Sequence, residues 1–313
     1  MSVVQADMNV EKMNCICNKR MHRELVGKGS DMSIGLVLEG GAMRGMYTAG
    51  VLDMFLDHNI SVDGIIGVSA GVLFGVNYPS KQKGRVIRYN KRFAKEPKYM
   101  GMKSFLTTGN IINKDFAYYT VPQKLDVFDQ EAFEQSGVDF YATLTNLETG
   151  KPEYVKLHNL FDEMEVLRAT SAMPLVSKIV EVDGKKYLDG GVSDSIPVDK
   201  MRDMGYDKVI VVLTRPLEYR KKPSNATLYK LVYGKYPKFV ETAMNRYQNY
   251  NDTVERIIDM ENKKEIFVIR PSKTVDIKRI ERDENKLQEM YDLGVSDCAE
   301  CMEALKSYLG ILE

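Results

Sequence analysis

The chain has 313 residues, of which 44% are hydrophobic and 28% are charged, so it is long enough to bury a substantial core and polar enough to stay in solution. Lys plus Arg and Asp plus Glu balance at 44 each, which leaves no global charge that would favour nucleic acid as a partner. A membrane-spanning helix needs about 20 apolar residues. The most apolar run here, residues 64–80, is shorter than that, and Asn77 and Pro79 interrupt it.

Residues 1–32 show no periodicity and are expected to form a loose extension, whereas residues 33–313 are expected to form one domain. The extension lacks the apolar core of a secretory signal, so we expect a cytoplasmic protein.

The four cysteines occur as two close pairs, Cys15 with Cys17 and Cys298 with Cys301, a pattern that raises the question of a metal site. The second pair falls on a helical stripe of apolar residues, in which Gly294 fills one turn without a side chain. The C-x-C spacing of the first pair is poorly suited to zinc. Reduced structural thiols are therefore favoured over a metal.

The elements after residue 32 alternate between strand and helix. Residues 33–40 (SIGLVLEG) are typical of a strand buried on both faces, and residues 41–59 show helical spacing. A second strand is predicted at 62–69 and a second helix at 70–78. This alternation predicts an α/β fold in which helices cover a parallel sheet.

Residues 79–139 are polar and hard to assign, apart from a helix at 83–96. We expect residues 81–139 to contribute to the wall or lid of a pocket. The later elements have clearer signals from turns and periodicity. They are two strands in 138–158, a helix in 160–174, a hairpin in 178–191 that turns at Asp183-Gly184, a helix and a strand in 198–214, a helix around 239–260, a strand in 265–271 and a long C-terminal helix.

Ser69 is the candidate nucleophile. It lies in GVSAG, residues 67–71, which matches the G-x-S-x-G pattern of a serine on a sharp turn between a strand and a helix. The pentapeptide alone is weak, but strand-like residues precede this serine and helix-like residues follow it, as the pattern requires. The alternative is a small residue tolerated at an ordinary junction.

A serine nucleophile needs a base. The chain has three histidines, none in surroundings typical of a catalytic histidine: His22, His58 and His158. Asp189, in YLDGGVSDSIPV, follows a short strand and precedes two glycines whose turn would expose its side chain at the strand end. A carboxylate there can act as the base, although an aspartate that only caps its own turn has the same pattern.

A glycine-rich turn, LEGGAMRG at residues 38–45, joins the first strand to the first helix. Its backbone N–H groups would point at an anion over the helix N-terminus, which fits a nucleotide phosphate or an oxyanion hole. Ala42 breaks the G-x-G-x-x-G fingerprint of dinucleotide sites, and no G-K-[ST] of a P-loop occurs.

The three motifs, GGAMRG, GVSAG and DGG in that order, resemble those of the patatin-like phospholipase family, over about residues 34–215. The resemblance implies a three-layer α/β/α sandwich with a mainly parallel central sheet, and a serine-aspartate dyad that needs neither histidine nor a metal or other cofactor. It implies Ser69 as the nucleophile and Asp189 as the base. It places the oxyanion hole at Gly40, Gly41, Ala42 and Arg44. The glycines that support the motifs are Gly45, Gly67, Gly71, Gly190 and Gly191.

The resemblance also implies acyl transfer to water, with a phospholipid, a lysophospholipid or another fatty acyl ester as substrate. The chain would then be a carboxylic ester hydrolase of the phospholipase A or lysophospholipase type. Glu39 and Ala42 depart from the aspartate and glycine that are common in the family. Alanine still provides a backbone N–H if its φ is ordinary. The altered loop also supports an alternative, a regulatory or binding module with little or no turnover, and a nucleotide-binding protein is a third interpretation.

Two basic stretches, residues 81–103 and 219–239, interleave Lys and Arg with tyrosines and apolar residues. Such stretches can dock on anionic lipid, which would give peripheral contact with a membrane. The alternative is that they are solvated helix faces balanced by acidic residues elsewhere in the chain.

Overall fold

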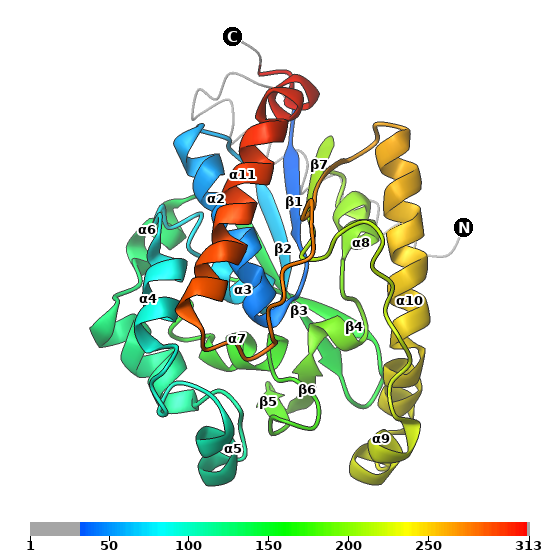
Figure 1. Cartoon of the computed structure of the whole chain (residues 1–313). Coiled ribbons are helices and arrows are strands. Elements are labelled where there is room, and N and C mark those ends of the chain that lie inside the picture. The colour runs from blue at the N-terminus through cyan, green and yellow to red at the C-terminus, as the bar shows by residue number, and fades with distance from the viewer. Residues whose placement is uncertain (1–31, 312–313) are drawn as a thin grey trace.

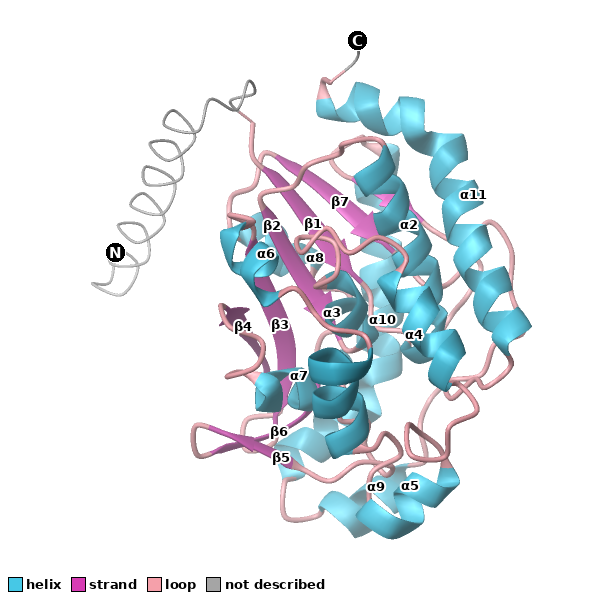
Figure 2. Ribbon diagram, turned by 90° about the vertical axis from the view of Figure 1, so that its left-hand side faces the viewer, coloured by secondary structure: helices cyan, strands magenta, loops and turns pink. Residues whose placement is uncertain are grey.

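The computed structural model describes residues 32–311, so the expectations for residues 1–31, with Cys15, Cys17 and His22, lie outside it. Eight strands form one sheet in the order β5-β6-β3-β2-β1-β7-β8, with β4 paired to β3 (Figures 1 and 2). The strands are β1 (Ile34–Leu38), β2 (Gly64–Val68), β3 (Asp139–Asn146), β4 (Pro152–Leu157), β5 (Val180–Val182), β6 (Lys185–Asp189), β7 (Lys208–Val212) and β8 (Phe267–Ile269).

The centre of the sheet is parallel, as the sequence predicts. β1 pairs in parallel with β2 and β7, which places Leu38 opposite both Gly67 and Val212. β2 also pairs in parallel with β3, and β7 with β8, whereas β4, β5 and β6 are antiparallel. The predicted hairpin is β5–β6, and its turn residues Asp183 and Gly184 have φ of 50° and 73°, as a type I′ turn requires.

Ten α-helices are described in residues 32–311. They are α2 (Met46–Asp57), α3 (Ala70–Gly75), α4 (Arg85–Phe93), α5 (Met102–Thr108), α6 (Gln130–Gln135), α7 (Met164–Thr170), α8 (Val198–Asp203), α9 (Ala226–Tyr233), α10 (Pro237–Asn262) and α11 (Glu284–Leu309). The predicted helices are present. No sequence pattern predicted α5, α6, α9 or the π-helical segment η2 (Asp115–Leu125), which are short or, in η2, contain a proline.

Alternate residues of the central strands face two separate cores. Leu36 and Leu38 of β1 pack into a large cluster with α2, α3 and α11. Val37 packs on the opposite face with Met201 of α8 and Ile257 of α10. Figure 1 shows α2, α3 and α11 on one side of the sheet and α8 and α10 on the other. The arrangement confirms the predicted three-layer α/β/α sandwich.

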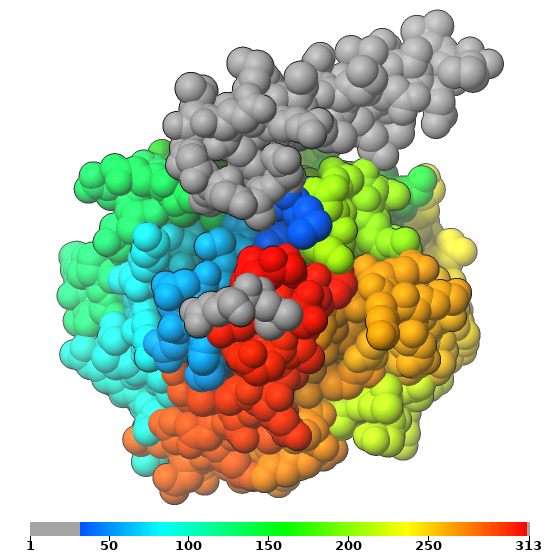
Figure 3. Space-filling view, turned by 90° about the horizontal axis from the view of Figure 1, so that it is seen from above, coloured from blue at the N-terminus to red at the C-terminus, as the bar shows by residue number. Residues whose placement is uncertain are grey.

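The C-terminal helix packs closely on α2, and Figure 3 shows the two side by side, α11 in red and α2 in blue. Gly50 of α2 lies against the carbonyl oxygen of Tyr291, and Gly294 of α11 lies against that of Tyr47. A Cβ on either glycine would overlap that backbone oxygen. The predicted apolar stripe of α11 is buried beside this contact: Leu287, Met290, Cys298, Met302, Leu305 and Leu309.

We expect Gly294→Ala to destabilise the fold by about 1–2 kcal/mol. Overlap with a backbone oxygen puts the cost in the upper part of the about 1–3 kcal/mol of overpacking, about 2–3, and the helix propensity of alanine recovers about 1. Urea unfolding measures this change. Ser296→Ala, at an exposed position of the same helix, is the matched control and should stay within about 0.5 kcal/mol of the unmodified chain. An unchanged stability of Gly294→Ala would show that the helices separate readily at this point.

Candidate active site

Ser69 occupies a strained turn between β2 and α3. Its φ of 54° and ψ of −120° are unusual for a residue with a side chain, and such conformations cost on the order of 1–3 kcal/mol. The Ser69 N–H donates to Oγ1 of Thr170 at 3.0 Å, and this hydroxyl donates in turn to the carbonyl of Thr143 at 2.8 Å. α7 and β3 therefore hold the turn in the conformation that the G-x-S-x-G pattern predicts.

The glycines of the motif are required by close backbone contacts. A Cβ on Gly71 would lie 2.5 Å from the carbonyl oxygen of Leu38, and one on Gly67 would lie 2.9 Å from the backbone of Gly71. Gly40 faces the same turn from the glycine loop after β1, where a Cβ would lie 3.3 Å from Cβ of Ser69. Gly45 lies against α3, where a Cβ would be 2.8 Å from the ring of Phe74. The glycine loop and the serine turn thus pack directly on each other.

Asp189 is the last residue of β6. Its pairing with Leu144 of β3 places it close to Ser69. Both side chains are buried, at 7% and 8% exposure. Burial raises the pKa of the Asp189 carboxyl, while the charge of Arg246 and a hydrogen bond from the Ser69 side chain lower it. The carboxylate also accepts the N–H of Gly191 at 2.8 Å. Asp189 therefore caps its own turn, and its carboxylate also faces Ser69.

The glycine loop presents backbone donors beside Ser69. Among residues 32–311, no hydrogen-bond acceptor is found for the N–H groups of Gly40, Gly41 and Ala42. The N–H of Arg44 instead donates to the carbonyl of Gly41 at 3.1 Å, within the 3₁₀ helix η1 (Ala42–Gly45). The amide of Arg44 is thus already paired and cannot serve an oxyanion hole, so Arg44 can contact a substrate only through its side chain.

Ala42 does not have the ordinary φ that the sequence interpretation assumed. Its φ is 49°, in the left-handed region, where a residue with a Cβ is disfavoured by about 1–2 kcal/mol. The family's usual glycine would adopt this conformation without that cost. The packing of the loop therefore fixes the direction of the Ala42 N–H, and it does so by holding Ala42 in a strained conformation.

Glu39 has a structural role that the sequence did not reveal. Its buried carboxylate accepts hydrogen bonds from the N–H of Thr214 at 2.6 Å, from the Thr214 hydroxyl at 3.0 Å and from the Tyr250 hydroxyl at 2.9 Å. These contacts join the ends of β1 and β7 to α10. Thr170 and Arg246 were missed as well, since neither lies in a recognisable motif.

An apolar pocket opens at Ser69. The empty space within it, with its open mouth, is about 980 Å³. Its walls come from Ala42 and Met43 of the glycine loop, from α3 and α7, and from residues of the polar segment 79–139. The wall residues of that segment are Arg85, Tyr89, Tyr99, Ile112, Ala117, Tyr118, Val121, Pro122 and Phe128. The expectation that this segment forms a pocket wall is confirmed.

The described histidines lie at the surface. His158 contacts Glu163 at 3.3 Å with 68% of its side chain exposed, and His58 is the exposed residue after α2. Within residues 32–311, no histidine lines the pocket, and no cluster of three His, Cys, Asp or Glu side chains is arranged to hold a metal ion. The same part of the chain contains no helix both long and apolar enough to cross a membrane.

Comparisons with known proteins give the family of the chain. The profile of the patatin-like phospholipase family matches residues 36–202, and a domain of unknown function, DUF6363, matches residues 236–310. Because the first match covers more than half of the chain, the chain belongs to the patatin-like phospholipase family.

Two relatives and one solved structure illustrate the range of similarity. The uncharacterized protein YjjU of Escherichia coli K12 is 28% identical over 83% of this chain and 74% of its own length. Lysophospholipase nte1 of Aspergillus fumigatus is 28% identical over 62% of this chain. The matched part is only 12% of that much longer protein. The superposition on the crystal structure of VipD from Legionella pneumophila covers 87% of this chain and 67% of the VipD chain, with a TM-score of 0.40 and 9% sequence identity.

We expect Ala42→Gly to stabilise the protein by up to about 1.5 kcal/mol, since release of about 1–2 kcal/mol of strain exceeds the roughly 0.4–1 kcal/mol by which glycine favours the unfolded chain. Ala299→Gly, at an exposed site within α11, is the control and should lose about 1 kcal/mol. Thermal unfolding of both variants measures the difference. Equal losses in the two would show that Ala42 is not strained.

Proposed function

We propose that this chain is a serine acyl hydrolase that cleaves fatty acyl esters with the Ser69–Asp189 dyad. Membership of the patatin-like phospholipase family supports lipid hydrolysis. The observation that carries the finer proposal is the position of Ser69, which faces a buried carboxylate, unpaired loop amides and an apolar pocket at once.

In the proposed mechanism, Asp189 accepts the proton of the Ser69 hydroxyl as its oxygen attacks the ester carbonyl. The N–H groups of Gly40, Gly41 and Ala42 stabilise the negative charge that develops on the carbonyl oxygen. Asp189 passes this proton to the departing oxygen, which leaves as the alcohol. Asp189 then takes a proton from a water molecule, whose oxygen attacks the acyl carbon and releases the fatty acid, and the proton returns to the Ser69 oxygen. Asp189 must be ionised for the first step, so its raised pKa implies that activity falls on acidification at a higher pH than an ordinary aspartate would give.

The pocket favours a long acyl chain as the group transferred to Ser69. Its walls are mostly apolar and aromatic, including Phe74, Phe128 and Leu167, and a hydrocarbon chain gains free energy by burial there. A phospholipid or lysophospholipid is the proposed substrate, and a serine esterase of lipid degradation is the proposed class. The alternative is a binding module of the same fold, favoured by the strained Ala42 of the oxyanion loop.

We expect Ser69→Ala and Asp189→Asn each to lower ester hydrolysis by at least about 10³-fold while the protein stays folded. Hydrolysis of a fluorogenic acyl ester measures the loss, and circular dichroism checks the fold. His158→Ala is the control and should retain full activity, because this histidine pairs with Glu163 at the surface.

Labelling by a fluorophosphonate probe separates the hydrolase from the binding module. An active nucleophile reacts covalently at Ser69, and the reaction is absent in Ser69→Ala. A wild-type chain that is folded but unlabelled would favour the binding module, and full activity in either dyad variant would refute the dyad.

We also propose peripheral contact with a membrane through α5 and α9. Figures 1 and 2 show both helices at the end of the molecule toward which the central strands point. They carry five of the nine most exposed large apolar residues in the described chain: Met102, Leu106, Leu228, Leu231 and Val232. Residues 97–114 and 219–240, which contain these helices, include nine Lys or Arg and no Asp or Glu. Apolar tips within basic segments suit an anionic lipid surface.

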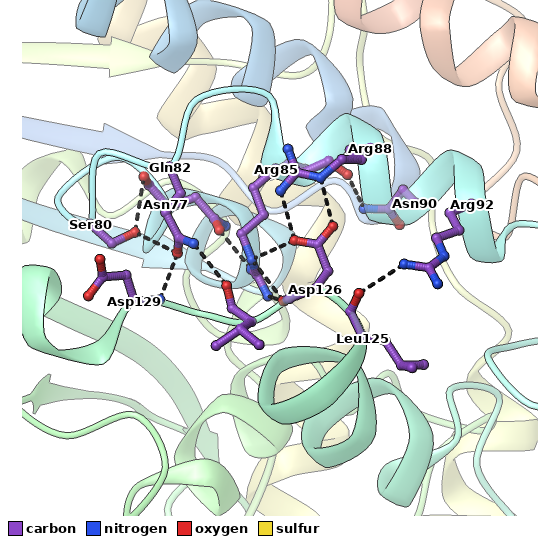
Figure 4. Close-up of polar contacts among 12 residues, drawn as sticks. Asn77, Ser80, Gln82, Arg85, Arg88, Asn90, Arg92, Leu125, Asp126 and Asp129 are labelled. Atoms are coloured by element: carbon purple, nitrogen blue, oxygen red, sulfur yellow. Dashed lines mark hydrogen bonds and ion pairs between the residues drawn. The ribbon is translucent and has the colours of Figure 1, made fainter.

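The first basic stretch contributes less to this surface than its composition indicates, because most of α4 faces the protein. Arg85 and Arg88 both bind Asp126, at 3.2 and 2.8 Å, in the network of Figure 4. Lys83 pairs with Asp57, and Lys95 with Glu284. The interpretation as basic residues balanced by distant acidic residues therefore applies to α4 and the lysines beside it, and also to Lys114 and Arg220, which pair with Glu165 and Glu255.

We expect the double variant Leu106→Ser, Leu231→Ser to bind anionic vesicles at least about tenfold more weakly, since each exposed leucine would insert apolar area into the lipid. Val127→Ser removes a side chain of 60% exposure that lies outside both helices, and is the matched control. Vesicle sedimentation measures binding to anionic and neutral lipid. Equal binding to the two lipids by the wild-type chain would contradict the proposal.

A further inference from the structure

Five cationic side chains gather around the active site: Arg44, Arg215, Lys221, Arg246 and Arg279. Within residues 32–311, none of them forms an ion pair or donates a side-chain hydrogen bond. They lie near enough to affect one another, since the charges of Arg246, Arg44 and Arg279 all lower the pKa of Lys221, and that of Arg215 lowers the pKa of Arg44. The fold thus concentrates positive charge where the chain provides few acids to balance it.

The cluster borders the catalytic groups directly. A Cβ on Gly191 would lie 3.2 Å from a terminal nitrogen of Arg246 and 3.1 Å from the carboxylate of Asp189. Arg279 lines the apolar pocket together with Ser69, and its carbonyl accepts the N–H of Met43 at 3.4 Å. Arg279 therefore lies at the pocket itself and Arg246 lies beside the carboxylate of Asp189, close to the point where an ester would react.

The cluster is costly without a bound anion. Nε of Arg44 and Nε of Arg246 are both buried without a hydrogen-bond partner, and an unpaired charged donor costs more than the about 1–3 kcal/mol of a neutral one. Burial and neighbouring cations lower the pKa of Lys221 to about 6, so this amine is mostly neutral at pH 7 and gains its proton when an anion binds beside it. Glu39 lies nearby, but Thr214 and Tyr250 already occupy its oxygens. Among the described residues, the charged ends of Arg215 and Lys221 contact only aromatic rings, those of Tyr219 at 4.2 Å and Tyr250 at 4.0 Å. Half-buried cations without an acidic partner are more common at binding sites than in structural cores.

We propose that this cluster binds the phosphate group of the substrate's headgroup, and that the domain of unknown function supplies part of the site through Arg246 and Arg279. Both lie within residues 236–310, and Arg215 and Lys221 lie in the connection that precedes this segment. Arginine suits phosphate because its planar guanidinium donates two parallel hydrogen bonds. The inference rests on the proposed function and narrows its substrate to acyl esters that carry phosphate.

The arrangement matches the two ends of such a molecule. The acyl chain would lie in the apolar pocket, the ester carbonyl at Ser69 and the loop amides, and the phosphate among the cations. A purely catalytic role for the charges explains less. Arg246 and Lys221 lower the pKa of Asp189, but Arg44, Arg215 and Arg279 are not among the groups that affect it most.

Calorimetry on the Ser69→Ala chain tests binding apart from catalysis. The probe is glycerophosphocholine, a soluble phosphodiester without an acyl ester, and glycerol and choline are the phosphate-free controls. We expect saturable binding of glycerophosphocholine alone, weakened at least about tenfold by Lys221→Met with Arg215→Gln. Lys222→Met, at an exposed neighbouring lysine, is the matched variant and should bind normally.

Three outcomes of this titration would overturn the proposal: no binding of glycerophosphocholine, equal binding of glycerol or choline, or binding of inorganic phosphate without binding of the diester. The last would identify a site for free phosphate. The double variant should fold, because Lys221→Met removes a desolvated polar group. Arg279→Gln, at an exposed side chain, is a second variant that should also weaken binding.

Kinetics then links the site to the substrate. A short-chain lysophosphatidylcholine and a monoacylglycerol of the same chain length are compared below their micelle concentrations. We expect the double variant to raise KM at least about tenfold for the phosphate ester and less than about twofold for the neutral ester. Equal losses on both esters would overturn the headgroup site. If the wild-type chain hydrolyses neither ester, the proposed hydrolysis fails, and the calorimetry still decides on the anion site.

Discussion

The close approach of two turns, one after β1 and one after β2, is the constraint on which the site depends. β1 and β2 are adjacent and parallel, so their carboxyl ends lie side by side. Gly40 and Gly71 let the two backbones come into contact, and that contact places the loop amides beside the Ser69 side chain. The positive φ of Ser69 is a consequence of the same packing, because the serine must leave the strand and start a helix at once.

Much of the site could be predicted because its central groups follow strand ends in short motifs. Ser69 follows β2, Asp189 ends β6, and the glycine loop follows β1, so local sequence marked each of them. Their meeting in space follows from β3, which pairs with both β2 and β6. The shortage of histidines in suitable surroundings already favoured a carboxylate as the base.

The remaining features depend on contacts that no local pattern records. The φ of Ala42 is set by the packing of the loop, so the residue type alone suggested an ordinary value. Short helices such as α5 and α9 span too few turns to show a period. The cations of α10 and of the segment before α11 are spread along the chain, and only the fold brings them to one place. The role of Glu39, which departs from the family's usual aspartate, became clear only from its contacts with Thr214 and Tyr250, which lie far away in the sequence.

The hydrogen bond from Tyr250 to Glu39 has a consequence for the limits of the catalytic unit. The residues that match the patatin-like family end at 202, yet Glu39 at the start of that segment depends on a helix within the next one. α11 likewise covers α2, the helix that follows the glycine loop. A chain shortened after residue 202 would expose both contacts to water. The boundary between the two family matches is thus crossed by contacts that support the glycine loop and the helix after it.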